Sequence, residues 1–172
     1  IGYTCFDKEA EFLVADAMGK DNARWGEDTI EVFFDPYNRD DQIRYYNIMV
    51  NPLNATQTAR NGFDRMWDPP TFRSATRREK NLWTVEMKIG FADILQDPKD
   101  FPAVWSINLI RTRQPKFDNK FEDTAWAPTN QNASHIPEMF GHAYFELGTR
   151  VPKAVRDFIK TRESLVKSSS GE

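Results

Sequence analysis

Oxygen-bearing side chains gather in the segment DPYNRDD, which spans residues 35–41. Carboxylate and amide oxygens are the ligands that calcium prefers in proteins, so this segment could hold a calcium ion. Its spacing does not match the EF-hand pattern D-x-[DN]-x-[DN]-G, and a solvated acidic turn is the alternative. The candidate calcium ligands are Asp35, Asn38, Asp40 and Asp41.

Groups that could catalyse a reaction are few. The chain has two histidines, His135 and His142, and one cysteine, Cys5. None of them lies in a G-x-S-x-G or H-E-x-x-H motif, which would indicate a nucleophile or a catalytic zinc site. Glu31 and Glu86 could form the carboxylate pair of a glycosidase, but isolated glutamates in antiparallel strands usually face solvent. We therefore expect no enzyme activity and no catalytic residue.

Tryptophan supplies the other side chains with binding chemistry. Trp83 and Trp105 lie in stretches with alternating apolar residues, which predicts that both belong to the core. Trp67 lies in the proline-rich loop FDRMWDPP, where a large aromatic ring needs a partner or a ligand, so it is a binding candidate. Trp25 precedes the apolar stretch 29–35, and a strand does not by itself need a tryptophan at its start.

Composition limits the class of protein. The chain has 172 residues, of which 40% are hydrophobic and 13% aromatic, enough for the core of one domain. Its 23 basic and 26 acidic residues give a net charge of −3 with no basic block, so nucleic acid is not an expected partner. The single cysteine excludes an internal disulfide. No run of about 18 apolar residues occurs, so we expect no membrane insertion.

The candidate residues lie among short segments with period-two alternation. In 82–91, for example, Trp83, Val85 and Met87 share one face while Thr84 and Glu86 share the other. Repeated short segments with this alternation predict an all-β fold. The expected architecture is an antiparallel β-sandwich of two sheets, immunoglobulin-like or jelly-roll-like. The predicted strands are 11–18, 29–35, 44–51, 72–79, 82–91, 104–113 and 142–147.

Residues 151–167 carry apolar side chains at helical spacing, and Pro152 suits a first turn, so one C-terminal α-helix is predicted there. We expect the sandwich domain to span residues 1–150 and residues 168–172 to be a disordered tail. The chain starts without methionine, inside what looks like a strand, so we expect it to be a piece of a longer polypeptide.

Six motifs in order carry a resemblance to a known family. The series resembles family 9 carbohydrate-binding modules and related DOMON-like domains of bacterial outer-membrane-associated proteins, over roughly residues 4–148. The resemblance implies a secreted, periplasmic or cell-surface location in bacteria and a further N-terminal strand that is missing here. The motifs are RWGEDTIEVFFDP, YYNIMVNPLNA, WTVEMKIGFADIL, VWSINLIRTR, TAWAP and PEMFGHAYFEL.

The resemblance also implies a carbohydrate site. A tryptophan at the place of Trp25 stacks on the apolar face of a sugar ring, and a glutamate at the place of Glu31 accepts hydrogen bonds from its hydroxyls. Trp126 would form a wall of the same cleft, with Asn130 and Gln131 as amide hydrogen-bonding groups. The alternatives are that Trp25 shields the sandwich end, Glu31 is solvated and Trp126 is core. Structural calcium also occurs in related modules.

Two departures leave other functions open. The family has an arginine near Met49 and a second tryptophan near Ser134. The leading interpretation is a non-catalytic carbohydrate-binding domain attached to further domains of a larger protein. The second is a structural or protein-interaction sandwich with a degenerate sugar site. The third is a haem-binding DOMON-type domain in which Met49 with His135 or His142 supplies the axial ligands.

Overall fold

The computed structural model describes residues 1–39, 44–61, 64–97, 101–130 and 133–145. Within these ranges the regular structure is almost entirely β-strand. The strands are β1 Gly2–Phe6, β2 Thr29–Asp35, β3 Tyr46–Val50, β4 Thr56–Arg60, β5 Arg73–Glu79, β6 Leu82–Lys88, β7 Val104–Arg113, β8 Glu122–Ala125 and β9 Gly141–Tyr144. Three 3-10 helices connect them: η1 Ala10–Phe12, η2 Phe91–Asp93 and η3 Pro137–Met139. None of these described helices has the length and apolar character needed to cross a membrane.

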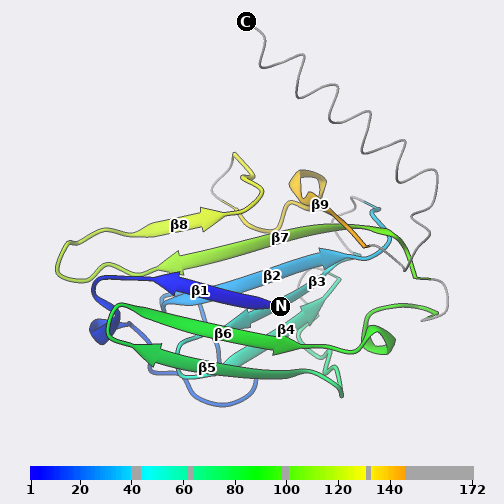
Figure 1. Ribbon diagram of the computed structural model, residues 1–172. Coiled ribbons are helices and arrows are strands. Elements are labelled where there is room, and N and C mark those ends of the chain that lie inside the picture. Colours follow the sequence, from blue (N-terminus) through cyan, green and yellow to red (C-terminus); the bar gives the residue numbers. More distant parts are fainter. Residues whose placement is uncertain (40–43, 62–63, 98–100, 131–132, 146–172) are drawn as a thin grey trace, which may run out of the picture.

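The strands form two antiparallel sheets that face each other, which confirms the predicted β-sandwich (Figure 1). The small sheet has the order β1-β6-β5. The large sheet has the order β4-β3-β2-β7-β8, with β9 paired to β7. We call the side of the large sheet that packs on the small sheet its inner face, and the opposite side its outer face. Residues directly opposite each other on paired strands point to the same face, so the register assigns each side chain to a face.

The main hydrophobic core lies between the two sheets. Ile30 and Val32 of β2 pack with Trp83 and Val85 of β6, and all four are almost completely buried. Trp105 belongs to the same cluster, so the core positions predicted for Trp83 and Trp105 are confirmed. Each of these side chains contributes about 1.5–3 kcal/mol through the apolar surface that it removes from water.

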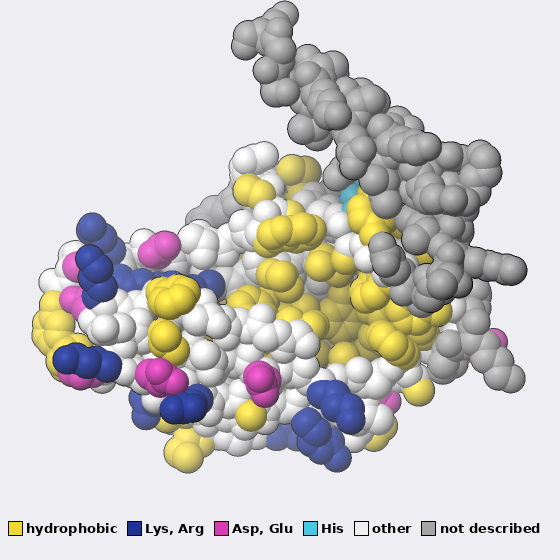
Figure 2. Space-filling view, in the orientation of Figure 1, with side chains coloured by type: hydrophobic (Ala, Val, Ile, Leu, Met, Phe, Trp, Pro, Cys, Tyr) yellow, Lys and Arg dark blue, Asp and Glu magenta, His cyan; other side chains and the backbone are white. Residues whose placement is uncertain are grey.

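An apolar groove of about 430 Å³ remains between the sheets. Hydrophobic side chains gather in it beside β7 and β9 (Figure 2). Trp105, Ile107 and Leu109 of β7 line it on the large sheet, and Met87 of β6 lines it on the small sheet. The small sheet has fewer strands than the large sheet and does not fill this part of the sandwich.

Most predicted strands are confirmed. The bounds of β2 and β7 are those predicted, and β3, β5, β6 and β9 overlap their predicted ranges. The strand predicted at 11–18 is wrong. Instead, η1 begins this segment, and the backbone N–H groups of Val14 and Ala17 donate to the side chains of Asp28 and Glu27. These carboxylates replace the strand partner that the segment would otherwise need.

Three strands lie outside the predicted ranges: β1, β4 and β8. For β1, the only expectation was that the chain starts inside a strand. β4 has the sequence TQTAR and β8 the sequence EDTA, and neither contains enough apolar residues to produce a clear alternation. Both lie toward the edges of the large sheet, where polar side chains are tolerated. The predicted helix at 151–167 and the tail at 168–172 lie outside the described residues.

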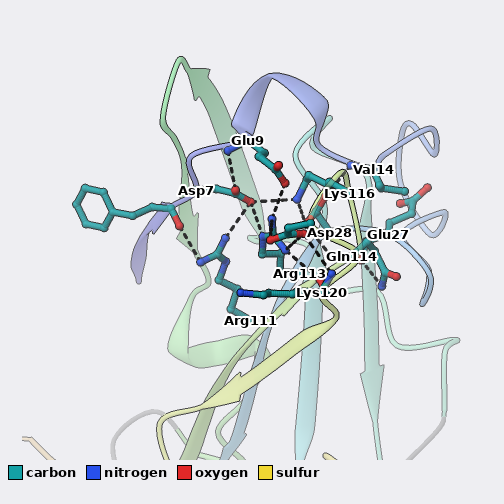
Figure 3. Close-up of polar contacts among 12 residues, drawn as sticks. Asp7, Glu9, Val14, Glu27, Asp28, Arg111, Arg113, Gln114, Lys116 and Lys120 are labelled. Atoms are coloured by element: carbon teal, nitrogen blue, oxygen red, sulfur yellow. Dashed lines mark hydrogen bonds and ion pairs between the residues drawn. The ribbon is translucent and has the colours of Figure 1, made fainter.

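A buried ionic cluster joins the end of β1 to the start of β2 and the end of β7 (Figure 3). The Lys116 ammonium lies 3.0 Å from a carboxylate oxygen of Asp7 and 3.2 Å from one of Asp28. All three side chains are buried, and Arg113 also pairs with Asp7. Burial opposes the ionisation of Asp7, but hydrogen bonds from the Glu9 backbone N–H and from Lys116 lower its pKa below the ordinary value.

Candidate functional site

The outer face of the large sheet carries two rows of side chains in register. The first row crosses five strands and comprises Gln57, Met49, Glu31, Ile110 and Ala125. The second row comprises Ala59, Asn47, Phe33 and Asn108. Glu31 is the ionisable residue of these rows, and it lies on the central strand β2. The outer face is therefore the place where an acidic group, amides and aromatic rings meet.

Glu31 is only 3% exposed, so the expectation of a solvated strand glutamate is wrong for it, whereas Glu86 is exposed as expected. The Asn47 side-chain amide donates to Glu31 Oε2 over 3.1 Å. The Trp25 side chain lies close enough to this carboxylate to lower its pKa. Burial raises the pKa of Glu31 from its ordinary 4.5 to about 7, the charge of Asp123 adds to the rise, and Asn47 and Trp25 oppose it. The hydrogen bond from Asn47 makes the burial tolerable.

The raised pKa of Glu31 predicts a pH dependence of stability. The folded state keeps a proton on Glu31 between pH 4.5 and about 7, whereas the unfolded state has lost it, so stability falls as pH rises through this window. We expect the urea midpoint to fall between about pH 5 and pH 8, and the variant Glu31→Gln to show a smaller fall. Glu86→Gln, an exposed control, should keep the wild-type slope. Identical slopes in wild type and Glu31→Gln would contradict the assignment.

Trp25 lies beside Glu31 with 61% of its surface exposed. Its position is fixed by the next two residues. Gly26 has a φ of +94°, a conformation that side chains with a Cβ rarely adopt, and it lets the chain turn between Trp25 and Glu27. The buried Glu27 carboxylate then accepts hydrogen bonds from the Ala17 backbone N–H at 2.8 Å and the Asn51 amide at 2.7 Å. The indole is thus an open surface on an anchored loop.

A cleft of about 600 Å³ opens next to this pair. Ile110, the neighbour of Glu31 in the register, lines it together with Asp123, Asn130 and Ser134. Asn130 has a φ of +54° at the tip of the loop that follows β8. Polar groups and a short serine side chain therefore line the cleft next to Ile110.

Asn108 anchors the loop that forms the cleft wall. Its amide donates to the Ala127 carbonyl at 2.9 Å and accepts from the Ala127 backbone N–H at 3.0 Å. The Thr129 hydroxyl donates to the Ala133 carbonyl at 2.8 Å. These bonds fix the backbone on both sides of Asn130 without using the Asn130 side chain.

An aromatic cluster lies further along the same face. The Tyr45 hydroxyl is 2.7 Å from His135 Nδ1, and the His135 ring meets Phe33 edge to face at 4.9 Å. Phe140 packs on Phe33 with ring centroids 5.5 Å apart. Burial lowers the pKa of His135, so its imidazole is neutral at pH 7. His135 acts here as a packing and hydrogen-bonding residue.

The structure does not bring Trp126 into the same cleft wall as Trp25. The residue before it, Ala125, shares the outer face with Ile110. The ring of Trp126 lies against Gly141, whose register partner Ile107 lines the inner groove. Trp126 is 54% exposed, so the alternative core position is wrong too. It lies on the inner side of the sheet because side chains alternate between faces along β8.

Trp67 is not available as a binding surface. It is 7% exposed, belongs to the main core, and packs on Tyr46 with ring centroids 4.7 Å apart. Its carbonyl accepts a hydrogen bond from the Thr58 hydroxyl, which holds the proline-rich loop against β4. The loop therefore folds inward and supplies the ring with protein partners in place of a ligand.

The calcium prediction stays untested, and two of its positions, Asp40 and Asp41, lie outside the described residues. The Asp35 carboxylate accepts hydrogen bonds from the backbone N–H groups of Tyr37 and Arg39, as in a tight turn. Asn38 contacts the Ser106 hydroxyl. In the described part of the chain, no group of three or more metal-binding side chains occurs. Calcium at this loop stays a prediction.

Gln131 also lies outside the described residues, and the haem interpretation stays untested. Met49 is 3% exposed and packs with Ala17, Ala23 and Ala55. His135 bonds to Tyr45 in a separate cluster. Both departures from the family pattern lie at the site, because Met49 is opposite Glu31 in the register and Ser134 lines the cleft.

Sequence reasoning missed several residues of this site. Asn47 and Ile110 flank the central strand, but their contact with Glu31 depends on a register that one sequence does not reveal. Asp123 lies in β8, which was not predicted. The alternation of side chains along a strand is the one usable signal. Asn47 and Met49 are two residues apart, so their side chains point to the same face of the sheet.

Solved structures are similar to this fold. A family 9 carbohydrate-binding module from Caldicellulosiruptor kristjanssonii in complex with glucose matches with a TM-score of 0.60 and 15% identity over 88% of this chain and 72% of that chain. A complex of such a module from the same organism with cellotriose gives a TM-score of 0.56 and 17% identity over 86% and 70%. A protein from Bacteroides uniformis assigned to carbohydrate binding gives 0.57 and 16% over 84% and 70%.

No family model and no curated protein matches the chain. The structural likeness nevertheless extends over most of its length at TM-scores above 0.5. It shows that the chain has the fold of the family 9 carbohydrate-binding modules, as the order of sequence motifs predicted.

Proposed function

We propose that this chain is a non-catalytic carbohydrate-binding domain that holds a sugar on the outer face of the large sheet. One observation carries the proposal: the exposed Trp25 ring lies beside the buried Glu31, whose register neighbour Ile110 lines a polar cleft. The similar modules solved with glucose and cellotriose support the class of ligand.

The chemistry of the site suits a pyranose. The flat indole offers an apolar surface for the C–H face of the ring, and the cleft lined by Ile110 offers amide, hydroxyl and carboxylate groups for the sugar hydroxyls. Because Glu27 anchors the Trp25 loop, little ordering is needed when the ligand binds. We assign the contacts with sugar to Trp25, Asn130 and Asp123, while Glu31, which is buried, supports the site from the central strand.

The domain acts within a larger extracytoplasmic bacterial protein in this proposal. A binding domain raises the local concentration of its attached partner on a glycan, and needs no catalytic group of its own. A Ca²⁺ ion at the Asp35 loop would be structural, far along β2 from Glu31.

The proposal is tested by titrating the purified chain with cellotriose and glucose in a calorimeter, followed by a broad glycan panel. We expect saturable binding with one site per chain and quenching of tryptophan fluorescence. If no sugar of the panel binds, the proposed function is contradicted and the interpretation as a protein-interaction sandwich is favoured.

A further inference from the structure

We infer that the outer-face site prefers amino sugars, which carry an ammonium group, over neutral sugars and sugar acids. The inference rests on the proposed function and names the class of sugar that its site would take. Its basis is the distribution of charge around Trp25 and the cleft.

The outer face is acidic. Among its positions in the described strands are the carboxylates of Glu31, Asp35 and Asp123, and no lysine or arginine. Asp35 accepts backbone N–H groups of its own turn. Glu31 keeps its proton up to about pH 7, so Asp123 supplies the negative charge beside the cleft. Asp123 is exposed and lines the cleft directly, with one oxygen accepting from the Thr112 hydroxyl at 3.0 Å.

The surrounding groups agree with a negative potential. Burial, together with the charges of Glu138 and Glu31, raises the pKa of Tyr45 to about 12. The groups that shift the pKa of Glu31 include Asp123 and two hydrogen-bond donors, and no cation. Met49, which lies opposite Glu31, adds no charge. A cationic ligand would therefore be attracted by the negative potential of the outer face, whereas a neutral ligand would gain nothing from it.

The described residues that line the cleft include the Asp123 carboxylate and no lysine or arginine. Arg24 pairs with Asp16 and Glu27. Arg65 lies beside Gln57, at the opposite end of the first row from the cleft. A ligand ammonium inside the cleft would form a charge-assisted hydrogen bond with Asp123. A sugar carboxylate would instead be repelled.

The test compares three trisaccharides of similar shape by calorimetry at low salt and about pH 6, where the amino groups of the ligand are protonated. They are a β-1,4-linked glucosamine trimer, an N-acetylglucosamine trimer, whose nitrogen is uncharged, and cellotriose. Each is titrated into wild type, Asp123→Asn and the control Glu86→Gln, which removes an exposed carboxylate from the small sheet.

We expect the glucosamine trimer to bind wild type about fivefold more tightly than either neutral trimer, as one ion pair in a solvated setting allows. The preference should disappear in Asp123→Asn, persist in Glu86→Gln and weaken with added salt. Equal binding of all three trimers would overturn the inference and leave the proposed function standing. A preference that survives in Asp123→Asn would overturn it as well. If no trimer binds at all, both the inference and the proposed function fail.

Discussion

Replacing Lys116 with methionine is expected to destabilise the domain by about 3–5 kcal/mol, because the change leaves buried carboxylates without their cation. The Lys116 ammonium is within 3.2 Å of both Asp7 and Asp28, and it is 1% exposed. Asp7 retains Arg113 and Arg111 in the variant. Within the described part of the chain, Asp28 retains only hydrogen bonds from the backbone N–H groups of Val14 and Gln114. Asp28 precedes β2, so the loss should loosen the strand that carries Glu31.

Urea unfolding followed by circular dichroism measures this effect. Lys20→Met is the matched control, since Lys20 forms an exposed ion pair with Asp68 and its removal should change the free energy of unfolding little. Lys116→Arg, which keeps the charge, should lose less stability than Lys116→Met. A Lys116→Met variant that unfolds at the same urea concentration as wild type would show that the cluster does not hold the fold together.

Replacing Trp25 with alanine is expected to weaken sugar binding at least about 30-fold, which corresponds to about 2 kcal/mol. Trp25 is 61% exposed, so its removal creates no cavity in the core and the fold should persist. The loss would come from the missing stacking surface.

Trp126→Ala is the control for this change. Trp126 is similarly exposed, but its ring lies on the inner side of the large sheet. We expect Trp126→Ala to bind cellotriose with wild-type affinity, and circular dichroism to show both variants folded. Unchanged affinity in Trp25→Ala would exclude the indole from the site.

The sequence predicted the strands that carry strong alternation. TIEVFFD followed by proline specified the bounds of β2, and VWSINLIRTR specified those of β7. It predicted the burial of Trp83 and Trp105, but not which side chains of the outer face would be covered. Glu31 alternates with apolar residues as a solvated residue would, yet the Trp25 loop and Asn47 cover it.

The remaining errors have a common physical cause. Trp67 lies in a proline-rich loop, and side chains in such loops are usually exposed to solvent. Here, however, Tyr46 and other core residues cover the Trp67 ring. Trp126 was grouped with Trp25 although the face it occupies depends on the register of β8, which is too polar to be recognised. Tertiary contacts and register decide burial, and neither can be read from local pattern.

The most direct test of sugar binding at the outer face is a titration of the ¹⁵N-labelled chain with cellotriose, monitored by two-dimensional NMR. The account predicts that the largest shift changes occur at the indole N–H of Trp25, the side-chain amides of Asn47 and Asn130, and the backbone N–H of Asp123. Changes confined to the Trp126 indole and the inner groove, with the Trp25 indole signal unmoved, would contradict it.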